Sequence, residues 1–188
     1  MRGEKRNYVT VLSAVFLILL AVSVIWIYLG LPKHSQRERF VLEVRYNNET
    51  IRYTMSELKD MPVAAGYGGI RKGDNSTEGP FTCKGLPIKY IIKKYNISGN
   101  YSIRVKYDGG LMREFPKDIV DGRLDVYDDK GVHIGVRNLV MTVIYEKDGF
   151  PIGEKDGPLQ IGFISDEGIF FVNESLWLKR VYMITIET

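Results

Sequence analysis

The chain has 188 residues, of which 45% are hydrophobic and 26% are charged, and its formal net charge is +3. This composition is that of a folded domain and excludes an intrinsically disordered chain. Positions 1–32 hold three basic residues and one acidic residue, which leaves 23 basic and 22 acidic residues beyond them. A formal charge of +1 there excludes the basic excess expected of a nucleic-acid-binding surface, so no nucleic-acid partner is expected. The single cysteine, Cys83, excludes an internal disulfide.

A long uncharged segment occupies residues 9–31, with the sequence VTVLSAVFLILLAVSVIWIYLGL. At about 1.5 Å per residue, a helix of this length crosses a bilayer core of about 30 Å. The basic start MRGEKR also fits a signal peptide, but the apolar run exceeds the roughly 7–15 residues of a typical hydrophobic region, and no clear cleavage site follows. We therefore predict an uncleaved membrane anchor, with a cleaved signal peptide and a buried core helix as alternatives.

The anchor divides the chain into a cytoplasmic basic N-terminus (1–8), the membrane span (9–31), a polar linker (32–39) and a domain (40–188). Three basic residues precede the span and three follow soon after it, so the positive-inside rule does not decide its orientation. The N-x-S/T sequence, by contrast, occurs only after the span, at Asn48, Asn75, Asn96, Asn100 and Asn173. About one such site is expected by chance, which favours a single-pass cell-membrane protein with an extracytoplasmic, glycosylated domain. The alternative is that these asparagines are turn residues.

The domain begins with alternating apolar and polar residues at 40–46, typical of a half-buried strand, and 51–54 is expected to return as its hairpin partner. Thr54 and Glu57 then have the spacing of a capping box, which predicts a short helix over 54–61. The later expected elements are, in chain order, a helix over 86–96, strands over 101–107 and 111–115, a helical turn over 116–122, and strands over 139–146, 159–165 and 176–187. This order predicts an α+β domain with mixed or mostly antiparallel sheets and short inserted helices.

A glycine-rich run, GYGGIR, occupies residues 66–71. Arg71 stands where a dinucleotide-binding fingerprint needs its third glycine, and no long crossover helix follows. The sequence also lacks the GK[ST] of a P-loop. The run therefore indicates a glycine-rich strand or loop that bends or lies very close to another part of the molecule. The pattern leaves open whether it also binds a ligand.

Metal-ligand patterns are weak throughout the sequence. His34 lies in the linker and His133 stands alone, so neither forms a zinc spacing with Cys83. The acidic residues at 125–129 lack the glycine and the final glutamate of a calcium loop. The sequence has no G-x-S-x-G motif, and no serine or cysteine has an obvious histidine partner, so a hydrolase has no support. We therefore predict no protein metal site.

Several segments follow one another in an order that resembles a known family. TMSELKDMPV (54–63), a glycine-bearing segment and GPFTCKGLPIKYII (79–92) resemble the pattern L-x-x-L-x-x-x-P … Y/W-x-G-V-P-L-x-x-L-L. VMTVIYEKDGFPIGEKDGPLQIGFISDEG (140–168) and LWLKRVYMITIE (176–187) resemble A-Y-x-x-D-G-x-P-L … D-G-P-L-R-L … W-V-K-x-V-x-x-I. These are the opening and closing patterns of the sulfite-oxidase-type molybdopterin-binding domain. The resemblance covers residues 40–187.

The resemblance implies a mixed α+β fold around a pterin cofactor that carries molybdenum. It also implies a cysteine thiolate on the metal, cationic side chains and backbone amides on the pterin phosphate, and oxygen-atom transfer as the reaction. The chain departs from the pattern at two places. The region of the expected metal-binding cysteine, VAAGYGGIRKG (63–73), has none, while Cys83 lies two residues before Gly85 of the G-V-P-L match. Gln160 replaces the arginine of D-G-P-L-R, whereas basic residues follow at 179–180.

These observations support three functions. The first is a membrane-anchored, extracytoplasmic binding or accessory module, non-catalytic and without molybdenum, that retains a pterin or another small anion. The residues predicted to bind it are Gly66, Tyr67, Gly68, Gly69, Arg71, Lys179 and Arg180. The second is a molybdopterin-dependent oxidoreductase whose metal is bound without the usual thiolate or by Cys83. The third is a cell-surface adhesion or sensor domain. In the first, Cys83 is expected to be a small buried residue.

Overall fold

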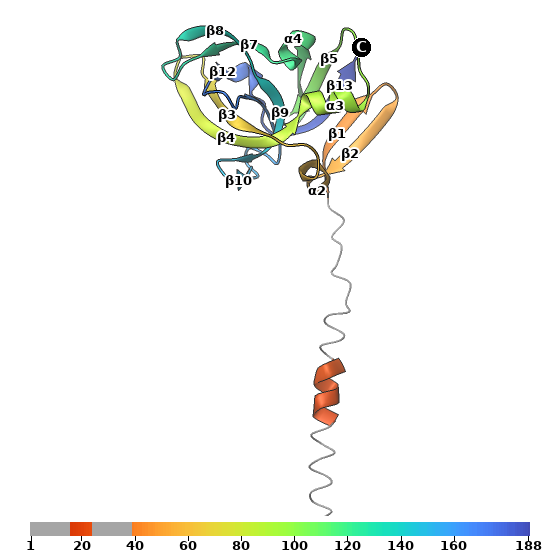
Figure 1. Cartoon of the computed structure of the whole chain (residues 1–188). Coiled ribbons are helices and arrows are strands. Elements are labelled where there is room, and N and C mark those ends of the chain that lie inside the picture. Colours follow the sequence, from red (N-terminus) through yellow and green to blue (C-terminus); the bar gives the residue numbers. More distant parts are fainter. Residues whose placement is uncertain (1–15, 24–38) are drawn as a thin grey trace, which may run out of the picture. The chain divides into compact units, whose positions relative to one another are not determined.

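A computed structural model of the chain describes residues 16–23 and 39–188, which belong to two separate units, Met1–Glu38 and Arg39–Thr188. In the first unit, residues 16–23 form a short helix (Figure 1). The side chains of these residues are exposed. Among the described residues, no helix is long and apolar enough to cross a membrane. The predicted N-terminus 1–8 and most of the span 9–31 and linker 32–39 lie outside the described residues. The anchor, its orientation and the cell-membrane localisation therefore stay predictions.

The first sheet of the domain has five strands in the order β2-β1-β13-β5-β6. The strands are β1 (Phe40–Tyr46), β2 (Glu49–Thr54), β5 (Ser102–Tyr107), β6 (Leu111–Pro116) and β13 (Val181–Glu187). The two predicted hairpins, β1–β2 and β5–β6, are confirmed. The last strand of the chain, β13, lies between them, parallel to β1 and antiparallel to β5. Because β1 and β13 are 135 or more residues apart in sequence, their pairing holds the two ends of the domain together.

The second sheet has eight strands in the order β10-β9-β4-β3-β12-β7-β8, with β11 also paired to β9. The strands are β3 (Ala64–Arg71), β4 (Thr77–Pro87), β7 (Arg123–Tyr127), β8 (His133–Asn138), β9 (Val140–Lys147), β10 (Phe150–Pro151), β11 (Gln160–Ile164) and β12 (Phe171–Asn173). The predicted strand at 139–146 is confirmed as β9, a central strand between β4 and β11 whose residues 141–145 are buried.

Four strands of this sheet form a closed ring. β3 pairs with β4, β4 with β9, and β9 with β11, all antiparallel. The ring closes where β11 ends, because Tyr67 N–H donates to Ser165 O at 2.7 Å and Ser165 N–H donates to Tyr67 O at 2.9 Å. A ring of so few strands leaves little room inside, so residues that point inward must be small or tightly packed.

Short helices connect the strands. α2 (Met55–Lys59) begins with the predicted capping box, in which Glu57 N–H donates to Thr54 Oγ1 and Thr54 N–H donates to the Glu57 carboxylate. α3 (Ile88–Lys94) buries its three isoleucines, the apolar face expected from the sequence. The remaining elements are α4 (Lys117–Val120) and the 3-10 helix η1 (Glu174–Leu176). The domain is thus α+β, rich in sheet and poor in helix, as predicted.

Candidate functional site

The glycine run lies in β3, and its glycines are covered by other parts of the protein. A Cβ atom at Gly66 would lie 2.5 Å from Ser165 O, and one at Gly68 would lie 2.8 Å from Phe163 O. A Cβ atom at Gly69 would overlap the Phe171 ring. These positions need glycine because β11 and β12 approach β3 too closely for any side chain. The sequence predicted that this run lies very close to another part of the molecule, and this is confirmed. The neighbouring atoms belong to Ser165, Phe163 and Phe171 of the protein itself.

Beside β3 the surface has a hollow of about 420 Å³, which we call the tyrosine hollow. It is lined by Ala65, Gly66, Tyr67, Thr82, Cys83, Lys84, Glu146, Gly149 and Asp166. The Tyr67 side chain is 44% exposed, and the ion pair between Lys84 and Glu146 spans 2.8 Å. Gly66 and Tyr67 are thus the two predicted binding residues that the structure brings together at a hollow.

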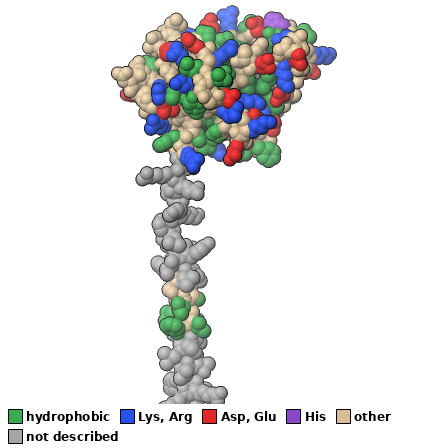
Figure 2. Space-filling view, turned by 180° about the vertical axis from the view of Figure 1, so that it is seen from behind, with side chains coloured by type: hydrophobic (Ala, Val, Ile, Leu, Met, Phe, Trp, Pro, Cys, Tyr) green, Lys and Arg blue, Asp and Glu red, His purple; other side chains and the backbone are tan. Residues whose placement is uncertain are grey.

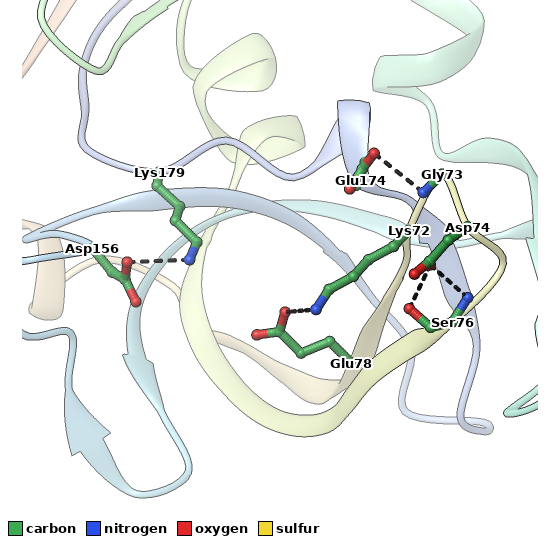
Figure 3. Close-up of polar contacts among 8 residues, drawn as sticks. All are labelled: Lys72, Gly73, Asp74, Ser76, Glu78, Asp156, Glu174 and Lys179. Atoms are coloured by element: carbon green, nitrogen blue, oxygen red, sulfur yellow. Dashed lines mark hydrogen bonds and ion pairs between the residues drawn. The ribbon is translucent and has the colours of Figure 1, made fainter.

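The predicted basic residues lie elsewhere and have partners. Arg71 donates to Gly131 O at 3.1 Å, and its guanidinium lies 4.2 Å from the centre of the Tyr127 ring. Lys179 forms an ion pair of 3.1 Å with Asp156, as Figure 3 shows. Arg180 is paired with Asp108 in the β5–β6 turn. These three cations do not line the tyrosine hollow.

Charges elsewhere on the domain are also mostly mutually compensated. Figure 3 shows Lys72 paired with Glu78 at 3.2 Å and the Gly73 N–H donating to the Glu174 carboxylate. In the loop that follows β3, the Asp74 carboxylate accepts hydrogen bonds from Ser76, which lower the pKa of that carboxyl. On the face of the described domain seen in Figure 2, basic and acidic side chains are interspersed without a large area of one sign.

Cys83 lies in β4 and is 2% exposed, so the expectation of a small buried residue is confirmed. Burial raises the pKa of its thiol to about 12. Its neighbours across the sheet were not visible in the sequence: the strand register pairs Cys83 directly with Gly66 on one side and with Lys147 on the other. Directly opposed residues of an antiparallel pair point to the same face, so Cys83 and the missing side chain of Gly66 share one face of the sheet, where the backbone of Ser165 and Asp166 lies closest to Gly66.

Gln160, which replaces an arginine of the family pattern, is fully buried. Its Oε1 accepts a hydrogen bond from Trp177 Nε1 at 2.8 Å, and its Nε2 donates to Asp156 O at 3.4 Å. The Trp177 ring packs against Phe81, with 6.1 Å between ring centres, and lies against Gly68. The amide and the indole therefore form an internal polar contact inside the ring of strands.

The residues that the resemblance assigns to a molybdenum-bearing pterin do not fit that group as they are arranged. Cys83 is 2% exposed in the interior of β4 and lies outside residues 63–73, where the family pattern has its metal-binding cysteine. Gln160 is neutral and both ends of its amide are bonded. Lys179 and Arg180 are held by acidic side chains. Within residues 16–23 and 39–188, no group of three His, Cys, Asp or Glu residues is placed to hold a metal ion.

Several residues of the tyrosine hollow are not among those predicted from the sequence: Thr82, Lys84, Glu146 and Asp166. They come from β4, β9 and the segment after β11, and no short motif connects them. One signal was available, since alternation along β4 puts Thr82 and Lys84 on one face of the strand. That they share this face with Tyr67 follows only from the pairing of β3 with β4.

No protein-family model matches the chain, and no curated protein matches it. Among solved structures, the domain is similar to the sulfane dehydrogenase SoxCD from Paracoccus pantotrophus, with a TM-score of 0.54 and 14% sequence identity. The match covers 81% of this chain and 39% of that chain. At this identity the likeness shows a related fold alone. It supports the family resemblance as far as a related fold, and no further.

Proposed function

We propose that residues 40–188 form a non-catalytic binding or accessory module on an oxidoreductase fold, and that the tyrosine hollow is its binding site. The observation that carries this proposal is the contrast between two sets of residues. Gly66 and Tyr67 line an accessible hollow. The polar side chains at or beside the motif positions expected to bind the cofactor instead form hydrogen bonds or ion pairs within the protein; they are Gln160, Lys179 and Arg180. We further propose that the predicted anchor holds this module at the outer face of a cell membrane.

The side chains of the tyrosine hollow favour a ring over a phosphate group. The exposed Tyr67 ring offers a flat apolar surface on which another ring stacks. The charged groups are Lys84, paired with Glu146, and Asp166, which has no ion pair within the described residues. One cation against two acids disfavours an anion. The ring of a pterin, without its phosphate, fits this chemistry better than the anionic ligand expected from the sequence.

A second candidate is a molybdopterin-dependent oxidoreductase with atypical metal ligation. The likeness to a sulfane dehydrogenase supports this candidate more directly than it supports a non-catalytic module. The pairing of Cys83 with Gly66 also puts the one thiol of the chain beside the region where the family pattern has its cysteine. No observation in the described residues favours an adhesion or sensor domain.

Production of the full-length chain in a host that makes the molybdenum cofactor separates the two candidates. The purified protein is analysed for molybdenum and for fluorescent pterin, and neopterin is then titrated into it as a probe. We expect neopterin binding without molybdenum, and weaker binding by Tyr67→Ala. Tyr182→Ala is the matched control, because Tyr182 is 39% exposed and lies in β13, away from the hollow.

Near-stoichiometric molybdenum would favour the oxidoreductase over the binding module. In that case Cys83→Ser tests the ligand: loss of the metal assigns it to this thiol, and full retention assigns it to other atoms. Absence of both pterin and neopterin binding would contradict the proposal for the tyrosine hollow. Equal neopterin affinity of the Tyr67→Ala and Tyr182→Ala proteins would do the same.

A further inference from the structure

A second hollow, of about 550 Å³, lies at the opposite end of the second sheet, beside the β7–β8 hairpin. We call it the arginine hollow. It is lined by Arg123, Val136, Arg137, Asn138, Glu167 and Phe170. These residues come from β7, β8 and the segment between β11 and β12. β8 is the edge strand of its sheet, so this side of the domain is open to ligands.

The two arginines of this hollow differ from the other arginines of the domain. Every other arginine in residues 40–188 contacts a side chain of another residue: Arg45 and Arg52 contact Glu43, Arg71 contacts Asn75, Arg104 contacts Glu187, Arg113 contacts Ser175, and Arg180 contacts Asp108. Within the described residues, Arg123 has no such contact, and Arg137 donates only to the carbonyl of its neighbour Val136, at 2.9 Å. Both guanidinium groups are therefore available to an external acceptor.

The acidic groups nearby leave these arginines free. Glu167 lies at the hollow but forms no ion pair with either arginine in the described structure. Asp125, two residues beyond Arg123 on the same strand, is 2.8 Å from His133 Nε2. The register pairs Arg123 with Asn138 and Leu124 with Arg137, so the Asn138 amide shares the face of Arg123, whereas Arg137 starts from the other face of the hairpin. Arg137 lies on the edge strand β8 and still lines the same hollow. The hollow thus combines two cationic donors with one neutral donor.

We propose that the arginine hollow binds the oxyanion group of a small organic anion. Arg123 and Arg137 donate to the oxyanion in the forked geometry that suits carboxylates and phosphates. Asn138 adds an amide donor, and Phe170 and Val136 contact the apolar body of the ligand. Glu167 disfavours ligands that carry several negative groups, because it would repel the second one. This inference is independent of the proposed function, since the two hollows share no residue.

The test is titration of the full-length chain with phenyl phosphate, followed by NMR shifts or calorimetry. Three comparison probes are used. Benzoate tests a carboxylate, inorganic phosphate tests the anion alone, and benzyl alcohol tests the apolar body alone. We expect phenyl phosphate or benzoate to bind at least tenfold more tightly than inorganic phosphate or benzyl alcohol. The double variant Arg123→Gln, Arg137→Gln should weaken that binding at least tenfold.

A matched control removes the same charge elsewhere. Lys59 and Lys93 are exposed residues of α2 and α3 and form no ion pair in the described structure, so Lys59→Gln, Lys93→Gln should leave binding within twofold. Arg123→Lys, which keeps the charge but loses the fork, should weaken binding by an intermediate factor. Equal weakening by the arginine and lysine double variants would overturn the proposal. So would inorganic phosphate binding as tightly as phenyl phosphate, or no binding of any probe.

Tyr67→Ala separates this inference from the proposed function. It should reduce neopterin binding at the tyrosine hollow and leave phenyl phosphate binding unchanged. If the arginine double variant loses phenyl phosphate binding while neopterin binding persists, the arginine hollow is a distinct site. Loss of phenyl phosphate binding in Tyr67→Ala would instead place the anion at the tyrosine hollow and overturn the proposal.

Discussion

The glycine-rich strand β3 and the β7–β8 hairpin belong to the same sheet but offer opposite surfaces. β3 has strands on both sides and protein atoms over its glycines, so a run that looks open in sequence is among the most tightly packed parts of the domain. β8 is an edge strand whose residues are almost all exposed, and the two arginines of the hairpin, Arg123 in β7 and Arg137 in β8, have no acidic partner in the described structure. The space available to a ligand beside a strand therefore depends more on the neighbouring strands than on the size of the strand's own side chains.

The largest effect is expected at Trp177, whose ring fills the space between Gly68 and Gly162. Trp177→Ala should lower the free energy of unfolding by about 3–5 kcal/mol, because it leaves a cavity and removes the partner of the buried Gln160 amide. Denaturant unfolding of the full-length chain measures this. Tyr182→Ala, at an exposed aromatic residue, should cost less than about 1 kcal/mol. Equal losses would contradict the tight packing of the β3 region.

The next effect is on the reactivity of Cys83. Because burial raises the pKa of its thiol to about 12, the thiolate fraction at pH 8 is on the order of a thousandfold lower than that of an exposed cysteine. Labelling with a disulfide reagent should therefore be slower by about that factor in the native chain than in denaturant. The rate should still rise between pH 9 and pH 11. Fast labelling that reaches a plateau near pH 9 would show an accessible thiol with an ordinary pKa.

A smaller loss of stability is expected when a single methyl group is added to β3. Gly68→Ala should lower the free energy of unfolding by about 1–3 kcal/mol, since the added Cβ meets Phe163 O at 2.8 Å and the Trp177 ring at 3.1 Å. The matched control is Gly153→Ala, because a Cβ there meets no atom within 4 Å. The control should stay within about 0.5 kcal/mol of the parent chain. If Gly68→Ala leaves the free energy of unfolding unchanged, β11 and Trp177 can move away from residue 68 without loss of stability.

The smallest expected effect on stability concerns the start of the β7–β8 hairpin. Asp121, just before β7, accepts hydrogen bonds from Lys117 and from Tyr101, the latter at 3.0 Å, and the Lys117 bond is the main cause of the lowered pKa of its carboxyl. A lowered pKa contributes stability above the unfolded value of about 4, and that stability is lost as the pH falls through the folded value.

Asp121→Asn should therefore lower the free energy of unfolding by about 0.5 kcal/mol at pH 7. Between pH 5 and pH 3, the stability of this variant should fall less steeply than that of the parent chain. Denaturant unfolding at several pH values measures both. Asp118→Asn is the control, because the Asp118 carboxyl forms no ion pair in the described structure. Identical slopes for the parent and Asp121→Asn chains would show that this carboxyl does not stabilise the hairpin.

Local features of the fold were predictable from the sequence. The hairpins at β1–β2 and β5–β6, the capping box of α2 and the buried face of α3 all depend on residues within a few positions of one another. Turn residues such as Asn47 and Asp108, with φ values of 52° and 42°, act over the same short range. The α+β class follows from the order of these elements. The family resemblance added the expectation of a related fold, which the likeness to the sulfane dehydrogenase supports.

The candidate sites were less predictable. Of the seven residues predicted to bind a ligand, two line the tyrosine hollow, and the role of all seven stays a prediction. The three predicted cations carry the right charge for a phosphate, but charge in the sequence does not show which acidic residue lies opposite in space. Arg123 and Arg137 received no functional assignment, because nothing near them in sequence shows that they lack partners.

The sequence by itself determined the periodicity, turns and caps of each element, because these depend on backbone preferences and on side chains that are close along the chain. Only the tertiary structure decided that Cys83 lies opposite Gly66, that Tyr67 and Ser165 close the ring of strands, and that two arginines of the β7–β8 hairpin have no acidic partner. Each of these depends on pairing between distant segments. That pairing is selected by the packing of the whole core, which no local pattern encodes.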